Sequence, residues 1–331
     1  MNASALCEGL RASRGFAHKR AISEVLGRLA PVLPAGIAVG DDCAAIADGN
    51  GHLLFAIEGF VDEFVGRMPW FAGYCSVMVN VSDIYAMGGR PLAVVDAIWS
   101  DGSQAASPVL DGMAEASRRY AVPIVGGHSN DKSARSQLAV AIIGRAQSLL
   151  TSFTARPGDS LVMAIDLRGR WEHPYPYWNA STEAPAERLR SDLAVLPELA
   201  EGGLCDAAKD ISMAGAIGTA LMLLDCSRVG ARINADAIPR PSTITVDDEA
   251  QLLRWLVSFP SYGFVLSVRP ENAQRVLARF DARGISCAVV GEVLVGTQVT
   301  LHHRGADAVL WDFAEQPFIT VDKRAISTLN P

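Results

Sequence analysis

The segment Val79–Pro91 constrains this chain more than any other part of its sequence. It reads Val-Asn-Val-Ser-Asp-Ile-Tyr-Ala-Met-Gly-Gly-Arg-Pro and continues an almost uncharged run of residues. Apolar spacing followed by two consecutive glycines predicts a helix over Trp70–Met87 that ends abruptly. A single carboxylate, that of Asp83, stands among the apolar residues, and burying it is costly unless a cation or hydrogen-bond donors meet it. The segment therefore predicts that Asp83 is a metal ligand.

Two other acidic positions indicate which metal. Asp41 and Asp42 precede an apolar run, and Asp210 precedes a predicted helix over Ala214–Leu224. Carboxylate oxygens suit Mg²⁺, which proteins usually share with substrate phosphates. The sequence shows no His or Cys cluster at the spacing of a softer metal site. For each position alone, a turn or a helix cap is the alternative, but the three positions together favour a magnesium site.

Several motifs, in this order along the chain, resemble those of the AIR (aminoimidazole ribonucleotide) synthase superfamily of ATP-binding proteins, which includes thiamine-monophosphate kinase and selenophosphate synthetase. The 79–91 segment carries the most specific resemblance, to a motif of the form Asn-hydrophobic-Ser-Asp-Ile-Ala-Ala-Met-Gly. The other matching segments are Gly40-Asp41-Asp42, Val125-Gly126-Gly127-His128-Ser129, Pro157-Gly158-Asp159, Asp210-Ile211-Ser212 and Gly291-Glu292-Val293. They cover nearly the whole chain, and they are typical of an uncharacterised AIR-synthase-related branch.

The resemblance implies a set of site residues. The predicted Mg²⁺ ligands are Asp41, Asp42, Glu58, Asp83 and Asp210. The predicted nucleotide-binding residues are Asn80, Gly126, Gly127 and Ser129, where the glycines let backbone N–H groups approach phosphate. The predicted catalytic residues are Asp42, Lys19 and His128. A solvated basic turn is the alternative for Lys19, and a loop histidine with only local bonds is the alternative for His128.

The expected function is Mg²⁺-dependent binding of ATP, with transfer of its phosphoryl group to a small-molecule acceptor or activation of that acceptor. The kinases of the superfamily continue Asp-Ile-Ser with Asp-Gly, whereas this chain continues with Met213-Ala214-Gly215, so one acceptor-side acid is absent. A non-catalytic nucleotide-binding subunit of a larger assembly is therefore the alternative. The aromatic segment that contains Trp171, Tyr175 and Tyr177 predicts either a lid that stacks on a planar substrate or ordinary packing.

Composition narrows the classes of partner. The net charge is −7, which argues against nucleic acid or an anionic membrane as the main partner. No apolar stretch is long enough for a membrane span, and no signal peptide is evident. The six cysteines are scattered without a C-x-x-C spacing and are typical of reduced thiols. These features predict a cytoplasmic protein.

The pattern of elements predicts two domains. Strands and helices over residues 1–151 indicate an α+β domain, a sheet covered by helices that carries the ATP and Mg²⁺ site. Residues 152–331 predict a second α/β domain, and the linker falls within 152–159. An amphipathic helix is expected over Ala21–Leu33. The resemblance also implies a homodimer that forms through the amino-terminal domains.

Overall fold

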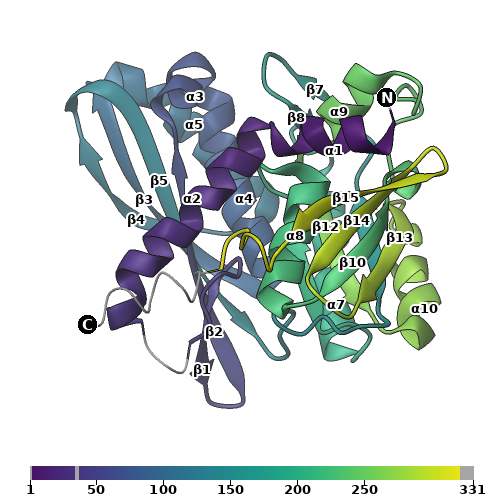
Figure 1. Cartoon of the computed structure of the whole chain (residues 1–331). Helices are drawn as coiled ribbons and strands as arrows, with labels where there is room; N and C mark the ends of the chain where they lie inside the picture. The colour runs from purple at the N-terminus through teal and green to yellow at the C-terminus, as the bar shows by residue number, and fades with distance from the viewer. Residues whose placement is uncertain (1, 34–36, 321–331) are drawn as a thin grey trace. The chain divides into compact units, whose positions relative to one another are not determined.

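The computed structural model describes residues 2–33 and 37–320 (Figure 1). They divide into two compact units. The first unit contains residues 42–149 and 183–201, and the second contains the described residues up to 41, residues 150–182, and the described residues from 202 onward. The chain thus passes between units at four places, one of which, 149/150, lies close to the predicted boundary at 151/152.

A five-stranded mixed sheet forms the centre of the first unit, with the strand order β1-β2-β5-β3-β4. Its strands are β1 (Ala44–Asp48), β2 (Gly51–Phe60), β3 (Arg90–Asp101), β4 (Ile124–Asn130) and β5 (Lys132–Ala146). The hairpin β1–β2 turns at Gly49, whose φ of 59° lies in the left-handed region that glycine adopts without strain. Glycine at this position therefore permits the tight turn between the two strands.

Five helices belong to the first unit: α3 (Asp62–Arg67), α4 (Pro69–Ala86), α5 (Ser103–Tyr120), α6 (Ala186–Leu193) and α7 (Val195–Glu201). Helices α4 and α5 pack backbone against backbone. A Cβ added at Gly73 would lie 2.0 Å from the Val109 carbonyl oxygen, and one added at Gly112 would lie 1.9 Å from that of Trp70. Glycine at these two positions therefore permits the crossing, and the predicted helix over Trp70–Met87 is confirmed.

The two faces of this sheet differ. Leu54 and Ile142 lie on the face that carries α4, and both are fully buried. The residues that alternate with them point the other way, and Phe55 and Ile57 are 53% and 65% exposed. The sheet of the first unit thus has one covered face and one apolar face that is largely exposed.

A seven-stranded mixed sheet forms the centre of the second unit, in the order β15-β14-β10-β13-β6-β12-β9. Its strands are β6 (Ser160–Ile165), β9 (Ala207–Asp210), β10 (Gly230–Asn234), β12 (Gly263–Val268), β13 (Ser286–Leu294), β14 (Gln298–His303) and β15 (Ala306–Asp312). The central strand β6 is apolar at nearly every position because both of its faces are buried.

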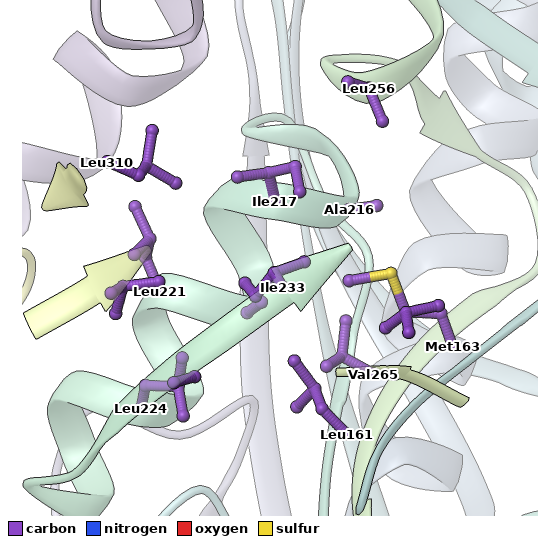
Figure 2. Packing of buried hydrophobic residues seen from close by; sticks show 14 of the residues in the cluster. Leu161, Met163, Ala216, Ile217, Leu221, Leu224, Ile233, Leu256, Val265 and Leu310 are labelled. Atoms are coloured by element: carbon purple, nitrogen blue, oxygen red, sulfur yellow. The ribbon is translucent and has the colours of Figure 1, made fainter. Parts of the chain in front are cut away.

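Helix α8 (Gly215–Ser227) covers one face of this sheet. Ile217, Leu221 and Leu224 of the helix lie in one core cluster with Ile233 of β10 and Val265 of β12 (Figure 2). Helix α10 (Pro270–Asp281) packs on β13, β6 and β12 through an apolar stripe that is buried. The second unit is therefore a sheet between helices, as predicted for an α/β domain.

The remaining elements of the second unit are smaller. They are α1 (Ala3–Arg11), α2 (Arg14–Leu29), the 3₁₀ turns η1 (Ala30–Val32) and η2 (Ala235–Ala237), α9 (Glu249–Leu256), and a small sheet of β7 (Arg170–Glu172), β8 (Tyr177–Asn179) and β11 (Phe259–Pro260). The predicted helix over Ala21–Leu33 in fact begins seven residues earlier, because the Ser13 hydroxyl accepts a hydrogen bond from the Phe16 N–H and caps it.

Candidate functional site

Helix α4 places three polar side chains on one of its faces. Ser76, Asn80 and Asp83 follow one another at intervals of four and three residues, and they are 0%, 0% and 5% exposed. The Asn80 amide nitrogen donates to the Ser76 carbonyl oxygen at 2.8 Å. The Asn80 carbonyl oxygen is buried and finds no hydrogen-bond partner in the part of the chain that the structure describes. A buried oxygen of this kind, one turn from a buried carboxylate, fits a site that receives a ligand.

Asp42 lies beside Asp83 in the first unit. Each offers a carboxylate oxygen within 4.8 Å of the other, which is a spacing that one cation can bridge. Two like charges so close repel each other strongly when partly buried. The ligand atoms are hard oxygens, as Mg²⁺ requires, so the residues present fit that ion.

Asp41 belongs to the second unit and has a different environment. Its side chain is 1% exposed. Its carboxylate accepts hydrogen bonds from the Ser152 N–H at 2.8 Å and from the Ser152 hydroxyl at 2.6 Å. The buried ammonium of Lys209 lies 3.8 Å from the same carboxylate. These contacts give Asp41 a structural role at the point where the chain passes between the units.

Asp210 is the last residue of β9, next to Lys209, and is 5% exposed. It pairs with Phe264 of β12, so the sheet of the second unit fixes its backbone. The loop that follows is held by the Gly215 N–H, which donates to the Ser212 carbonyl oxygen at 2.8 Å. Asp210 is thus an acid at a strand end, and a short loop separates it from helix α8.

Lys19 lies on α2 in the second unit and is partly exposed. It follows Gly15 by four residues, so the two share a helix face. A Cβ at Gly15 would lie 2.3 Å from the Met213 carbonyl oxygen, so this turn of α2 packs tightly on the loop after Asp210. The structure therefore turns the Lys19 face of α2 toward that loop.

The glycine motif lies on β4, an exposed strand at the edge of the first unit's sheet. His128 pairs with Ala97, and Gly127 pairs with Asp96, so their positions face opposite sides of the sheet. Glu58 and Asp96 both lie opposite residue Val140 of β5 and share the helix-covered side. His128 and Glu58 are therefore not brought together, whereas Gly127 and Asp96 are.

Asp96 is a candidate that the sequence interpretation did not include. Burial raises the pKa of its carboxyl above the usual value. A Cβ at Gly127 would lie 2.2 Å from an Asp96 carboxylate oxygen, so the glycine makes room for this side chain. A Cβ at Gly126 would meet nothing within 4 Å. The sequence signal for Asp96 is that it is the one acid in the middle of the apolar run Pro-Leu-Ala-Val-Val-Asp-Ala-Ile.

Family models identify the chain. Residues 40–146 match the model described as AIR synthase related protein, N-terminal domain, and residues 158–304 match the corresponding C-terminal domain. The chain belongs to the AIR synthase family. The predicted resemblance and the predicted two-domain fold are thereby confirmed.

Individual relatives agree with this assignment. An uncharacterized protein of Synechocystis sp. is 49% identical over 282 residues, which cover 85% of this chain and 86% of that protein. Thiamine-monophosphate kinase of Synechococcus elongatus is 27% identical over 77% of this chain and 83% of the kinase. The structure of PurL from T. maritima complexed with ATP matches with a TM-score of 0.68 at 19% identity, over 84% of this chain. This chain spans about half of the length of that PurL chain, 46%.

In the residues that the structure describes, no helix has both the length and the apolar character needed to cross a bilayer.

Proposed function

We propose that this chain is an Mg²⁺-dependent, ATP-binding enzyme that transfers the ATP phosphoryl group to a small-molecule acceptor or uses it to activate that acceptor. The observation that carries the proposal is the pair of carboxylates of Asp42 and Asp83, within 4.8 Å of each other, with Asp83 buried on a mostly apolar helix. Its family includes a relative named for its kinase activity and a PurL that binds ATP. Carboxylate-held Mg²⁺ would neutralise the charge of the ATP phosphates.

The proposed roles follow from the surroundings of each residue. Asp42 and Asp83 are the first Mg²⁺ ligands, with Asn80 beside them for the nucleotide. Asp210 is a further proposed ligand because of its motif, Asp210-Ile211-Ser212, and because its side chain is buried at the end of β9. We propose that Asp41 mainly positions Asp42.

The other predicted residues stay in the proposal. Glu58 is an exposed residue of β2 opposite Val140 of β5, and we keep it as a proposed Mg²⁺ ligand. Gly126, Gly127 and Ser129 lie on the edge strand β4, whose backbone groups are exposed. Lys19 is proposed as the cation that approaches phosphate. His128 remains a proposed catalytic residue, and its position on β4 faces the side of the sheet opposite to that of Gly127.

Titration calorimetry with the non-hydrolysable analogue AMPPCP tests the nucleotide site. We expect Mg²⁺-dependent binding to the wild type, and a loss of at least about tenfold in affinity, about 1.4 kcal/mol, for Asp83→Asn and Asp42→Asn. Asp111→Asn, the same change on the exposed side of α5 in the same unit, is the matched control. Equal affinity in all four proteins would remove Asp42 and Asp83 from the metal set.

Turnover separates an enzyme from a nucleotide-binding subunit. The absence of an acid at Met213 leaves the subunit as the second candidate. ADP release should rise when a panel of small acceptors is added to the Mg-ATP complex. Tight binding of Mg-ATP with no acceptor-stimulated release would favour the subunit.

We also propose a homodimer that forms through the first unit. The exposed face of its sheet carries Phe55, Ile57, Val95 and Ile143, which are 38% to 65% exposed. A contiguous apolar surface of this kind marks an interaction site. Sedimentation equilibrium should give twice the chain mass for the wild type and a monomer for Ile57→Lys, and a monomeric wild type would contradict the dimer.

A further inference from the structure

The aromatic segment of the second unit divides into two groups with different surroundings. Trp171 and Trp178 meet Trp255 edge to face, with ring centroids 6.0 and 5.4 Å apart. The Trp178 indole N–H donates to the Asp166 carbonyl oxygen at 3.0 Å, and the Arg254 guanidinium lies over the Trp171 ring. Edge-to-face contacts, burial and a satisfied indole are typical of core packing. The tryptophans are therefore structural.

The two tyrosines are arranged differently. The rings of Tyr175 and Tyr177 are stacked, with centroids 5.2 Å apart and an interplanar angle of 15°. Both side chains are partly exposed. Phe259 meets the Tyr177 ring edge to face at 6.0 Å, and its N–H donates to the Pro176 carbonyl oxygen at 2.9 Å. The small sheet thus holds the stacked pair in place without burying it.

The stacked pair lies against the loop that begins at Asp210. The Tyr177 hydroxyl donates to the Met213 sulfur at 3.7 Å. Met213 is 43% exposed although the residues on either side of the loop, Ile211 and Ala214, are buried. An exposed thioether next to stacked rings gives a polarizable surface that adapts to a flat ligand. Met213 follows Asp210 by three residues in the same loop.

We propose that Tyr175, Tyr177 and Met213 form a stacking platform for a planar heteroaromatic ring of the acceptor. The inference rests on the proposed function, because it names the class of acceptor that the proposed enzyme would take. A partly exposed, nearly parallel ring pair offers a flat surface, whereas Trp171 and the buried Trp178 meet edge to face, as in a core. The platform selects a flat ring over acceptors such as selenide or an aliphatic amide.

Calorimetry on the full chain, with Mg²⁺ and AMPPCP present, tests the platform. The probes are thiamine monophosphate and flavin mononucleotide, and ribose 5-phosphate is the probe with a phosphate and no aromatic ring. We expect at least one aromatic probe to bind the wild type more tightly than ribose 5-phosphate does. Tyr175→Leu and Tyr177→Leu should weaken that binding by about threefold to tenfold. Tyr175→Phe and Tyr177→Phe keep the aromatic ring, so they should bind the probe as tightly as the wild type does.

The outcomes separate this inference from the proposed function. AMPPCP affinity should be unchanged in the four tyrosine variants, and their thermal unfolding shows whether the small sheet is intact. Failure of both aromatic probes to bind the wild type, or wild-type affinity in the folded Leu variants, would overturn the platform. Absence of AMPPCP binding to the wild type would instead overturn the nucleotide site, even where an aromatic probe binds.

Discussion

The substitution Asp83→Asn should stabilise the protein when Mg²⁺ is absent. Its carboxylate is 5% exposed and within 4.8 Å of that of Asp42. At that separation two unit charges repel by roughly 3–4 kcal/mol if the effective dielectric constant is about 20. Asparagine keeps the shape of the side chain and removes the charge. We therefore expect the free energy of unfolding to rise by about 1–3 kcal/mol in EDTA, since neighbouring groups and solvent already compensate for part of the repulsion.

Thermal unfolding followed by circular dichroism, with EDTA and then with Mg²⁺ and AMPPCP, measures both halves of this prediction. The wild type should gain stability on adding the ligands, because binding to the folded state alone shifts the equilibrium. Asp83→Asn should unfold at a higher temperature than the wild type in EDTA, and its unfolding temperature should rise less when the ligands are added. Asp111→Asn, an exposed acid of the same unit, should behave as the wild type. A variant less stable than the wild type in EDTA would refute the idea that Asp42 and Asp83 repel.

Three further substitutions test other buried charges. Arg269→Met removes the guanidinium bonded to the buried carboxylate of Asp159 and should cost about 3 kcal/mol in urea unfolding. Asp41→Asn removes the partner of the buried Lys209 ammonium and should also cost about 3 kcal/mol, while Mg²⁺ affinity falls less than in Asp42→Asn. Burial raises the pKa of Asp96 in the folded protein above its ordinary value of about 3.9. The group therefore favours folding when the pH is below that ordinary value, and this contribution is lost as the pH rises through the folded pKa. Asp96→Asn should therefore exceed the wild type in stability at pH 7 and lose this advantage near pH 4.

Exposed residues provide the controls for these substitutions. Arg275→Met lies on the exposed side of α10, the helix that follows Arg269, and should change stability by less than about 0.5 kcal/mol. A cost for Arg269→Met no larger than that would contradict the buried ion pair. An Asp41→Asn protein as stable as the wild type would contradict the structural role of Asp41. A stability difference for Asp96→Asn that is the same at both pH values would show that this carboxyl titrates normally.

Elements whose own sequence decides their structure were predictable. Helix α4 has eighteen mostly apolar residues and is followed by two glycines, so its type and its end were both evident. Strand β6 is a continuous apolar run, which is typical of a central strand. Asp83 was predictable as a candidate for the same reason, because a carboxylate in such a helix contrasts with everything around it.

Elements that depend on distant partners were not predictable. Strand β9 reads Ala-Ala-Lys-Asp, which has no strand periodicity, and it exists because it pairs with β12 more than fifty residues later. Helices α6 and α7 are separated at Ala194, a residue that is favourable in helices and gives no sign of a break in the sequence. Asp96 was missed because an acid within a strand resembles an exposed residue, and its burial depends on the missing side chain of Gly127 on another strand.

The consecutive acids Asp41 and Asp42 show most clearly what the sequence left open. Both fit the motif equally well, and only the folded chain distinguishes them. Asp41 has the Ser152 donors and the Lys209 ammonium around its carboxylate, so its charge is compensated within the protein. Asp42 has the carboxylate of Asp83 as its neighbour, with oxygens within 4.8 Å of each other. Two hard carboxylate oxygens at that spacing are what a divalent cation such as Mg²⁺ can bridge, so the structure favours Asp42 over Asp41 as the ligand.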